Sequence, residues 1–260
     1  MTEKITELIN AYVEKFKKEM QPETSWRKPV VGFADAKDKK FKDLKEIIGP
    51  NHALPQEIVP GARSVIVYFL PFSEEIVKSN IFEEESSRAW DIANIDTNNL
   101  IVGINKMLHE WLKEQGWHAS MLPPTYNYDE KKLISDWSHK SAAFIAGIGK
   151  FGVHHVLITD QGCCGRLGSI ITDMELEKTP FVEEEYCLYY RNGSCKACMR
   201  RCPNQAFREE TDKITFDRHK CNEQIYDKIV PIYPSGIGDA CGKCMCGVPC
   251  SCQNPSKRMN

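Results

Sequence analysis

The sequence predicts an α+β protein in which a helix-and-strand domain precedes a small cysteine-rich domain. The first observation is that segments with helical and strand-like patterns alternate over roughly the first 175 residues. The second is that no cysteine precedes Cys163, whereas ten of the twelve lie between Cys187 and Cys252. We therefore expect one domain over residues 1–178 and a second over residues 179–260.

Most segments of the first domain have a recognisable signal. Apolar residues recur at helical spacing in three segments: residues 1–20, 86–115 and 133–147. Four segments have the short apolar runs of strands: residues 30–33, 58–72, 117–122 and 166–173. Asp136 is a candidate cap for the third helix. Residues 147–159 predict a Gly-rich turn and then a strand, on which His154 and His155 face opposite ways, and we expect no metal at that pair.

Composition narrows the function classes. Hydrophobic residues make up 42% of the 260 residues and charged residues 27%, which is ordinary for a soluble globular protein. The net charge of −2 does not indicate nucleic acid or an anionic membrane as main partner. The longest apolar run, Ser64 to Phe72, is too short to span a bilayer, and no secretory signal is visible. We expect a cytoplasmic protein with no membrane partner.

Cysteine spacing carries the strongest chemical signal. Residues 194–203, SCKACMRRCP, match the last three cysteines and the proline of the bacterial ferredoxin run C-x2-C-x2-C-x3-C-P. The first cysteine of that run is missing, because residue 192 is Asn. Cys187 lies upstream across a loop with an Asn-Gly turn signal, so we expect it to replace the missing ligand.

Four more cysteines form a stretched second run: Cys221, Cys241, Cys244 and Cys250. The wide gap after Cys221 contains prolines and glycines and is expected to be a loop. In two-cluster ferredoxins one cysteine of each run serves the other cluster. This crossed arrangement predicts one 4Fe–4S cluster on Cys187, Cys195, Cys198 and Cys250. It predicts a second on Cys202, Cys221, Cys241 and Cys244.

Alternatives remain for several cysteines. Two zinc sites with four thiolates each would use the same residues, although the C-x2-C-x3-C-P spacing favours iron–sulfur clusters. Cys246 or Cys252 is an alternative to Cys250 as a ligand. Cys163 and Cys164 are interpreted as small buried residues in a Gly-rich turn, with a position beside a bound cofactor as the alternative.

Together these motifs resemble a known group. The order is PGARSVIV, SDWSHK, AAFIAGIGKFG, RLGSIITD and then the cysteine runs. It resembles the epoxyqueuosine reductase and reductive dehalogenase superfamily, from about Ile58 to Cys250. Members join a cobalamin-binding, nitroreductase-like α/β domain to a ferredoxin-like domain with two 4Fe–4S clusters. The resemblance implies an iron–sulfur oxidoreductase that passes electrons to a cobalamin-type cofactor, which reduces an unidentified small or modified substrate. A ferredoxin or flavodoxin is the implied electron donor.

The resemblance also implies where the chemistry occurs. It makes Asp136 and His139 candidate catalytic residues. For His139 the alternative is a structural histidine bonded to a backbone carbonyl. The residues implied to contact the cofactor are Tyr126, Ser138, Gly147, Gly149, Phe151, Gly152, Gly168 and Ser169. Ordinary turn chemistry is the alternative explanation of each glycine.

Two departures from the family pattern bear on the reaction. The family's presumed proton-donating Asp aligns with Leu133. The chain also ends at Asn260, without the helical-repeat extension that helps the family's enzymes to hold tRNA, which argues against tRNA as substrate. Two other functions therefore stay open: a ferredoxin-type electron-transfer protein without a corrinoid, and a flavin-dependent reductase that binds FMN.

Overall fold

The computed structural model describes residues 1–211, 213–233 and 238–258. Up to residue 172 the elements are α1 (Thr2–Met20), β1 (Val30–Asp35), α2 (Lys39–Ile47), α3 (Pro55–Ile58), β2 (Ser64–Pro71), α4 (Glu74–Ser79), α5 (Arg88–Glu114), β3 (Tyr128–Asp129), β4 (Ile134–Ser135), α6 (His139–Ile145), β5 (Gly149–Phe151), β6 (Leu157–Thr159) and β7 (Gly165–Thr172). Beyond them are α7 (Leu188–Asn192), α8 (Ala197–Arg200), β8 (Phe207–Glu209), β9 (Ile214–Phe216), α9 (Arg218–Glu223), a π-helix (Gln224–Ile229) and two 3-10 turns (Val230–Ile232 and Pro255–Arg258). Helices and strands are mixed along the chain, as the sequence predicted.

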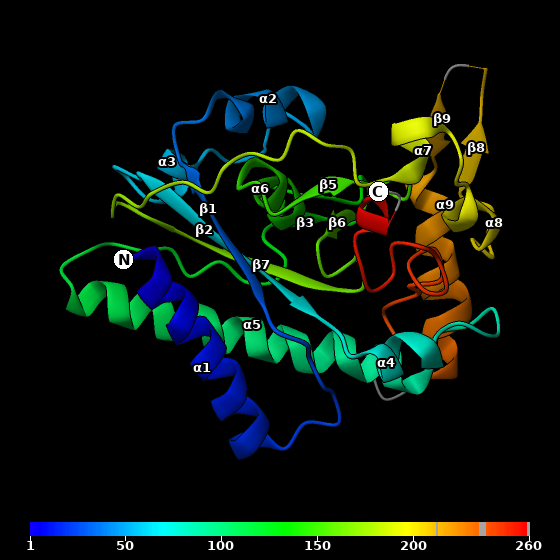
Figure 1. Cartoon of the computed structure of the whole chain (residues 1–260), viewed down its shortest axis with the longest axis horizontal. Coiled ribbons are helices and arrows are strands. Elements are labelled where there is room, and N and C mark those ends of the chain that lie inside the picture. The colour runs from blue at the N-terminus through cyan, green and yellow to red at the C-terminus, as the bar shows by residue number, and fades with distance from the viewer. Residues whose placement is uncertain (212, 234–237, 259–260) are drawn as a thin grey trace.

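The main sheet has β2 at its centre, antiparallel to both β1 and β7. Every residue of β2 is buried, because the sheet is covered on both faces. Ile66 and Tyr68 pack with residues of α1 and α5, whereas Val65 and Val67 pack with residues of α6. Figure 1 shows α1 and α5 on one side of this sheet and α2 and α6 on the other. The alternation of side chains along a strand explains how one apolar run serves two cores.

The long helix α5 begins and ends close to where the sequence predicted. The Ser87 side chain accepts a hydrogen bond from the Trp90 N–H and caps its N-terminus. Gly116, with φ of +83°, follows its C-terminus in the left-handed region that favours glycine. The prediction of a helix over residues 86–115 is therefore confirmed.

The prediction of a helix over residues 133–147 is wrong at its start. Leu133 has φ of +54°, which no α-helix accommodates, and the next two residues form β4. α6 begins only at His139, and the Ser138 side chain caps it instead of Asp136. Similarly, the expected strand at residues 117–122 is reduced to one isolated bridge, between Ala119 and Thr172.

Residues 147–159 also differ from the expectation of one strand. They form an antiparallel hairpin of β5 and β6, and His154 and His155 lie in the turn between them. His155 has φ of +59°, as a turn residue can and a strand residue cannot. The expected loop after Cys221 is likewise helical over residues 224–232, in the π-helix and the first 3-10 turn.

The C-terminal segment returns to the turn between β6 and β7 (Figure 1). The backbone N–H of Cys163 donates to the carbonyl of Cys250 (2.9 Å), and that of Cys164 donates to the carbonyl of Ser251 (3.1 Å). The Arg27 guanidinium adds a bond to the Cys252 carbonyl (2.9 Å). Residues 250–252 are thereby held against the first part of the chain.

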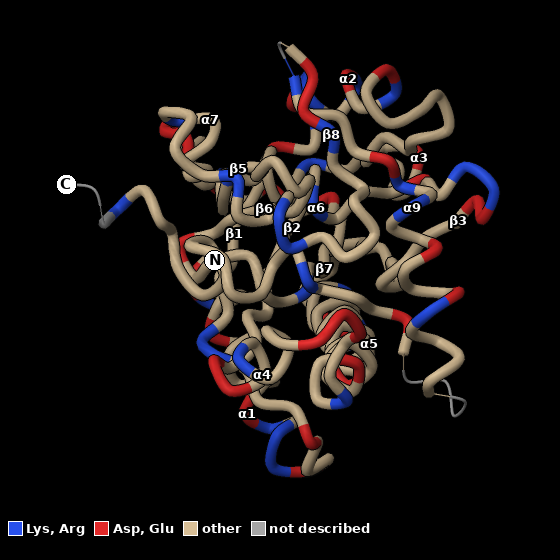
Figure 2. Tube along the Cα trace, turned by 90° about the vertical axis from the view of Figure 1, so that its right-hand side faces the viewer, with Lys and Arg blue, Asp and Glu red and all other residues tan. Residues whose placement is uncertain are grey.

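Charge is spread over the molecule. Figure 2 shows basic and acidic segments interspersed along the visible chain. This matches the small net charge of −2. None of the described helices has both the length and the apolar character of a membrane span.

Candidate functional site: two thiol sets and a cavity

The structure brings together four thiols that are far apart in sequence. Cys187, Cys195, Cys198 and Cys250 all line one small cavity. Burial, and then the neighbouring Cys250 and Cys187 thiolates, raise the pKa of the Cys198 thiol to about 12. Thiols in such surroundings ionise only if a cation joins them, as iron in a cluster would.

Local structure explains how Cys187 meets Cys195. Cys187 is the N-cap of α7, and its carbonyl accepts a hydrogen bond from the Arg191 N–H (2.9 Å). The helix ends at Gly193, whose φ of +73° turns the chain back. The Asn-Gly signal in the sequence thus marks the reversal that returns Cys195 to the same cavity.

The second predicted set is also gathered in space. Burial, and then the Cys221 and Cys202 thiolates, raise the pKa of Cys241 to about 11, against a backbone hydrogen bond from Lys243 that lowers it. The pKa of Cys244 is raised well above its ordinary value, first by burial and then by Cys241, Cys221, Cys198 and Cys202. Each thiol of the set therefore lies within electrostatic reach of others in it, which suits a polynuclear cluster.

The remaining four cysteines are not among the residues that line the small cavity. Cys246 is fully buried, 4.0 Å from the Cys164 sulfur, and accepts a hydrogen bond from Asn80 Nδ2 (3.5 Å). Cys252 lies near charged groups of Arg27, Glu74 and Lys78. Neither lines the cavity that Cys250 lines. Cys163 and Cys164 are completely buried, as the structural interpretation of the Gly-rich turn expects.

A larger cavity of about 660 Å³ lies between α2, α6, β5 and the chain around β9 and α9. Its aromatic lining residues are Trp137, Phe144, Phe151 and Phe216. Its charged lining residues are Lys40, Asp43, Lys140 and Arg218. A cavity of this size, mostly apolar with a few charges, suits a flat organic cofactor that carries an anionic group.

Some of the predicted cofactor residues lie at this cavity. Ser138, His139 and Phe151 line it. Ser169 lies behind the lining, where its hydroxyl bonds to Trp137 Nε1 (2.9 Å) and His139 Nδ1 (2.8 Å). Tyr126 is not among the lining residues; its backbone pairs with Ser135 and Asp136.

His139 is a buried histidine with both ring nitrogens occupied. Nε2 lies 3.0 Å from the Pro123 carbonyl, which only accepts, so Nε2 carries the proton and Nδ1 accepts from the Ser169 hydroxyl. Burial lowers the pKa of His139 to about 4. The neutral ring thus holds the Pro123 backbone, and the contacts favour the structural interpretation over proton donation.

Asp136 is not among the residues that line the larger cavity. Its backbone carbonyl accepts from the Ala53 N–H (2.8 Å), and its carboxylate raises the pKa of His52, which burial lowers more strongly. Leu133, which aligns with the family's Asp, does line the cavity. The lining position therefore carries an aliphatic side chain where the resemblance led us to look for an acid.

The predicted glycines face protein atoms. A Cβ on Gly147 would lie 2.4 Å from Pro180. One on Gly149 would lie 2.3 Å from Ile158, and one on Gly168 would lie 2.4 Å from Tyr68. On Gly152 it would meet the His154 ring at 2.6 Å. Close packing within the protein accounts for all four, so a role against a cofactor finds no support at these positions.

Three cations at the cavity, Lys40, Lys140 and Arg218, gave no signal in the sequence. Lys140 is an exposed residue, and its ammonium donates to the His155 carbonyl (3.1 Å). Burial and then Arg218 lower the pKa of Lys140, while the Cys221 thiolate opposes them. Arg218 starts α9, which carries Cys221. These residues join the cavity to the second thiol set, and only the fold reveals that they meet.

Comparisons with known proteins were made in sequence and in structure. No family model matches the chain. The chain is 25% identical over 184 residues to a curated epoxyqueuosine reductase of Francisella cf. novicida (strain Fx1), which covers 69% of this chain and 49% of that protein. The chain thus spans about half the length of its curated relative.

Solved structures show a similar fold at lower identity. The epoxyqueuosine reductase from Bacillus subtilis superposes with a TM-score of 0.54 at 17% identity, covering 95% of this chain and 66% of that one. An epoxyqueuosine reductase in complex with an epoxyqueuosine-modified tRNA stem loop gives 0.52 at 16% identity, covering 94% and 64%. A catabolic reductive dehalogenase gives 0.56 at 17% identity, covering 88% and 30%. In sequence and in fold the chain is therefore similar to the epoxyqueuosine reductase and reductive dehalogenase superfamily, the group that its motifs indicated.

Proposed function

We propose that the chain is an iron–sulfur reductase in which residues 179–260 form a ferredoxin-like unit with two 4Fe–4S clusters. One observation carries the proposal: four thiols separated by up to 63 positions, Cys187 to Cys250, line a single cavity. The first cluster uses Cys187, Cys195, Cys198 and Cys250, and the second uses Cys202, Cys221, Cys241 and Cys244. The similarity to an epoxyqueuosine reductase supports the reductase class.

Residues 1–178, a nitroreductase-like unit, provide most of the larger cavity, which we assign to a cobalamin-type cofactor. Such a cofactor supplies two-electron reduction chemistry when it receives single electrons. The aromatic side chains would hold the flat ring, and Lys40, Lys140 and Arg218 would bind the phosphodiester of its side arm. The Cys221 thiolate influences the pKa of Lys140, which lines the cavity. The second cluster would therefore lie beside this cavity and deliver electrons to it.

The substrate is reduced at the same cavity. A two-electron reduction also consumes protons, and Lys140 is the lining residue whose pKa is lowered toward the physiological range. A ferredoxin or flavodoxin is the proposed electron donor. The relative solved with a modified tRNA stem loop makes that stem loop the first substrate to test.

The test is an inventory of iron, acid-labile sulfide, cobalt and flavin per chain after anaerobic reconstitution with each cofactor. About eight iron ions and one corrinoid per chain are expected. Full clusters without corrinoid uptake would instead indicate an electron-transfer protein, and a bound flavin would indicate an FMN-dependent reductase. Zinc in place of iron and sulfide would refute the proposed iron–sulfur clusters and with them the whole proposal.

A further inference from the structure

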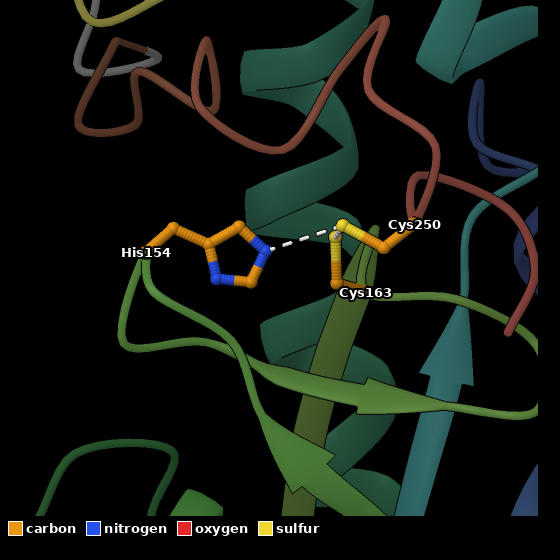
Figure 3. A group of neighbouring side chains, drawn as sticks. All are labelled: His154, Cys163 and Cys250. Carbon is orange, nitrogen blue, oxygen red and sulfur yellow. Dashed lines mark hydrogen bonds between the residues drawn. The ribbon is translucent and has the colours of Figure 1, made fainter. Parts of the chain in front are cut away.

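A histidine points at one of the proposed cluster ligands. The His154 Nε2 atom lies 3.5 Å from the Cys250 sulfur, and the Cys163 sulfur lies 4.0 Å from it on another side (Figure 3). These three residues form a group with the spacing of a single-metal site. The arrangement therefore allows two roles for His154: metal ligand or hydrogen-bond donor.

The second ring nitrogen decides between them. His154 Nδ1 lies 3.2 Å from the backbone nitrogen of Val156, whose N–H donates to it. Nδ1 must then present its lone pair, so in the neutral ring the proton is on Nε2. A metal bound at Nε2 would require a proton on Nδ1, facing the Val156 N–H. His154 is thus a donor to Cys250 rather than a metal ligand.

The surrounding packing fixes this orientation. His154 is buried, and it lies in the turn between β5 and β6. A Cβ on Gly152 would approach the His154 ring to 2.6 Å, so the absence of a side chain there leaves room for the ring. Cys250 is held from the other direction by the hydrogen bond between its carbonyl and the Cys163 N–H (2.9 Å). Donor and acceptor are therefore both preorganised.

We propose that His154 is a positioning residue that donates Nε2–H to the Cys250 thiolate and raises the reduction potential of the first cluster. The inference rests on the proposed function, because it needs the first cluster to exist. A hydrogen bond to a cluster sulfur stabilises the more negative, reduced state, and such bonds are among the determinants of cluster potential. In the second set the Cys202 sulfur accepts from a backbone donor, the Ala206 N–H (3.2 Å). Each proposed cluster thus has a ligand sulfur that accepts an N–H bond, and the first receives it from a side chain that substitution can remove.

The test is a redox titration of the reconstituted full chain, followed by EPR of the reduced clusters. In His154→Leu the reduction equilibrium constant of one cluster should fall about tenfold, which is about 59 mV for a one-electron couple. The other cluster should keep its potential. His154→Gln keeps an N–H donor and should stay closer to the wild-type value. The control is His118→Ala, which removes an exposed histidine bonded to Asp173 and should change neither potential.

A second measurement is made on the wild-type His154 side chain, so that it does not depend on whether a variant keeps its cluster. Pulsed EPR of reduced protein labelled with ¹⁵N-histidine should detect one weak nitrogen coupling, which is absent in His154→Gln. No coupling, a strong coupling from an Fe–N bond, or unchanged potentials in His154→Leu would each overturn the inference. Iron and sulfide assays separate this from failure of the proposed function, since in that case the wild-type chain would hold no first cluster at all.

Discussion

Cys250 shares a cavity with Cys187, Cys195 and Cys198, although 52 positions separate it from Cys198. Sequence spacing favoured Cys250 as the fourth ligand and left Cys246 and Cys252 as alternatives. It could not exclude them, because which of three nearby thiols faces the cavity depends on how the C-terminal segment lies against Cys163. The partner of Cys250, His154, gave no sequence signal for the same reason: the two residues meet only through the tertiary fold.

Replacing Cys250 by Ser should therefore remove one cluster. We expect iron and sulfide to fall to about half of the wild-type content after reconstitution, because one cube would lose a thiolate ligand. Cys252→Ser is the matched control and should keep the full content, since Cys252 does not line the cavity. Equal iron in both variants would mean that the crossed ligand assignment must be abandoned.

His139 predicts a dependence of stability on pH. Burial lowers its pKa from 6.5 to about 4 in the folded protein, so the unfolded chain binds more protons between those values. The contribution of His139 is complete above about pH 6.5 and is lost as the pH falls toward 4, by at most about 3 kcal/mol. In urea unfolding of the apoprotein, His139→Gln should show a flatter decline over that range. Parallel curves for the two proteins would show that His139 protonates freely in the fold.

At the scale of elements, unbroken apolar runs and long periodic segments were predictable. All of β2, all of β7 except its first residue and all of α5 lie within the segments predicted from their own residues. The region from 117 to 159 did not, because its short strands and turns depend on contacts with other segments. Trp137 is buried and stacks on Phe41 (5.9 Å between ring centroids). In the sequence it fits the apolar periodicity of a helix, although it precedes α6.

The start of α6 can be tested by comparing its two candidate caps. The Ser138 hydroxyl accepts from the Ser141 N–H (3.2 Å), so Ser138→Ala should lower the free energy of unfolding by about 1 kcal/mol. Asp136→Ala should cost clearly less, because the Asp136 carboxylate does not cap the helix. Thermal unfolding of both variants is the measurement, and a larger loss in Asp136→Ala would support the cap that the sequence suggested.

At the scale of the whole molecule, the larger cavity is formed by two parts of the chain together. Its walls come from α2, α6 and β5 in the first part of the chain and from Phe216 and Arg218 in the cysteine-rich part. The sequence predicted that a cofactor would lie near residues 126–169, but it did not reveal that the cysteine-rich part completes the cavity. That closure would bring the proposed electron source next to the proposed cofactor, so the proposed reaction would need both parts of the chain.

Phe216 tests this shared construction. It stacks on Phe207 and His155, with ring centroids 5.0 and 5.1 Å away, and presents part of its surface to the cavity. In Phe216→Ala the dissociation constant for a corrinoid should rise about tenfold, because a lost aromatic contact costs about 1 kcal/mol beyond its buried area. Spectroscopic titration of the cluster-loaded protein measures the constant, and iron content should stay unchanged. Phe82→Ala is the control, since Phe82 is an exposed phenylalanine that does not line the cavity. Equal affinity in both variants would place the corrinoid outside this cavity, and an unchanged constant together with lost iron would assign Phe216 to the second cluster's fold instead.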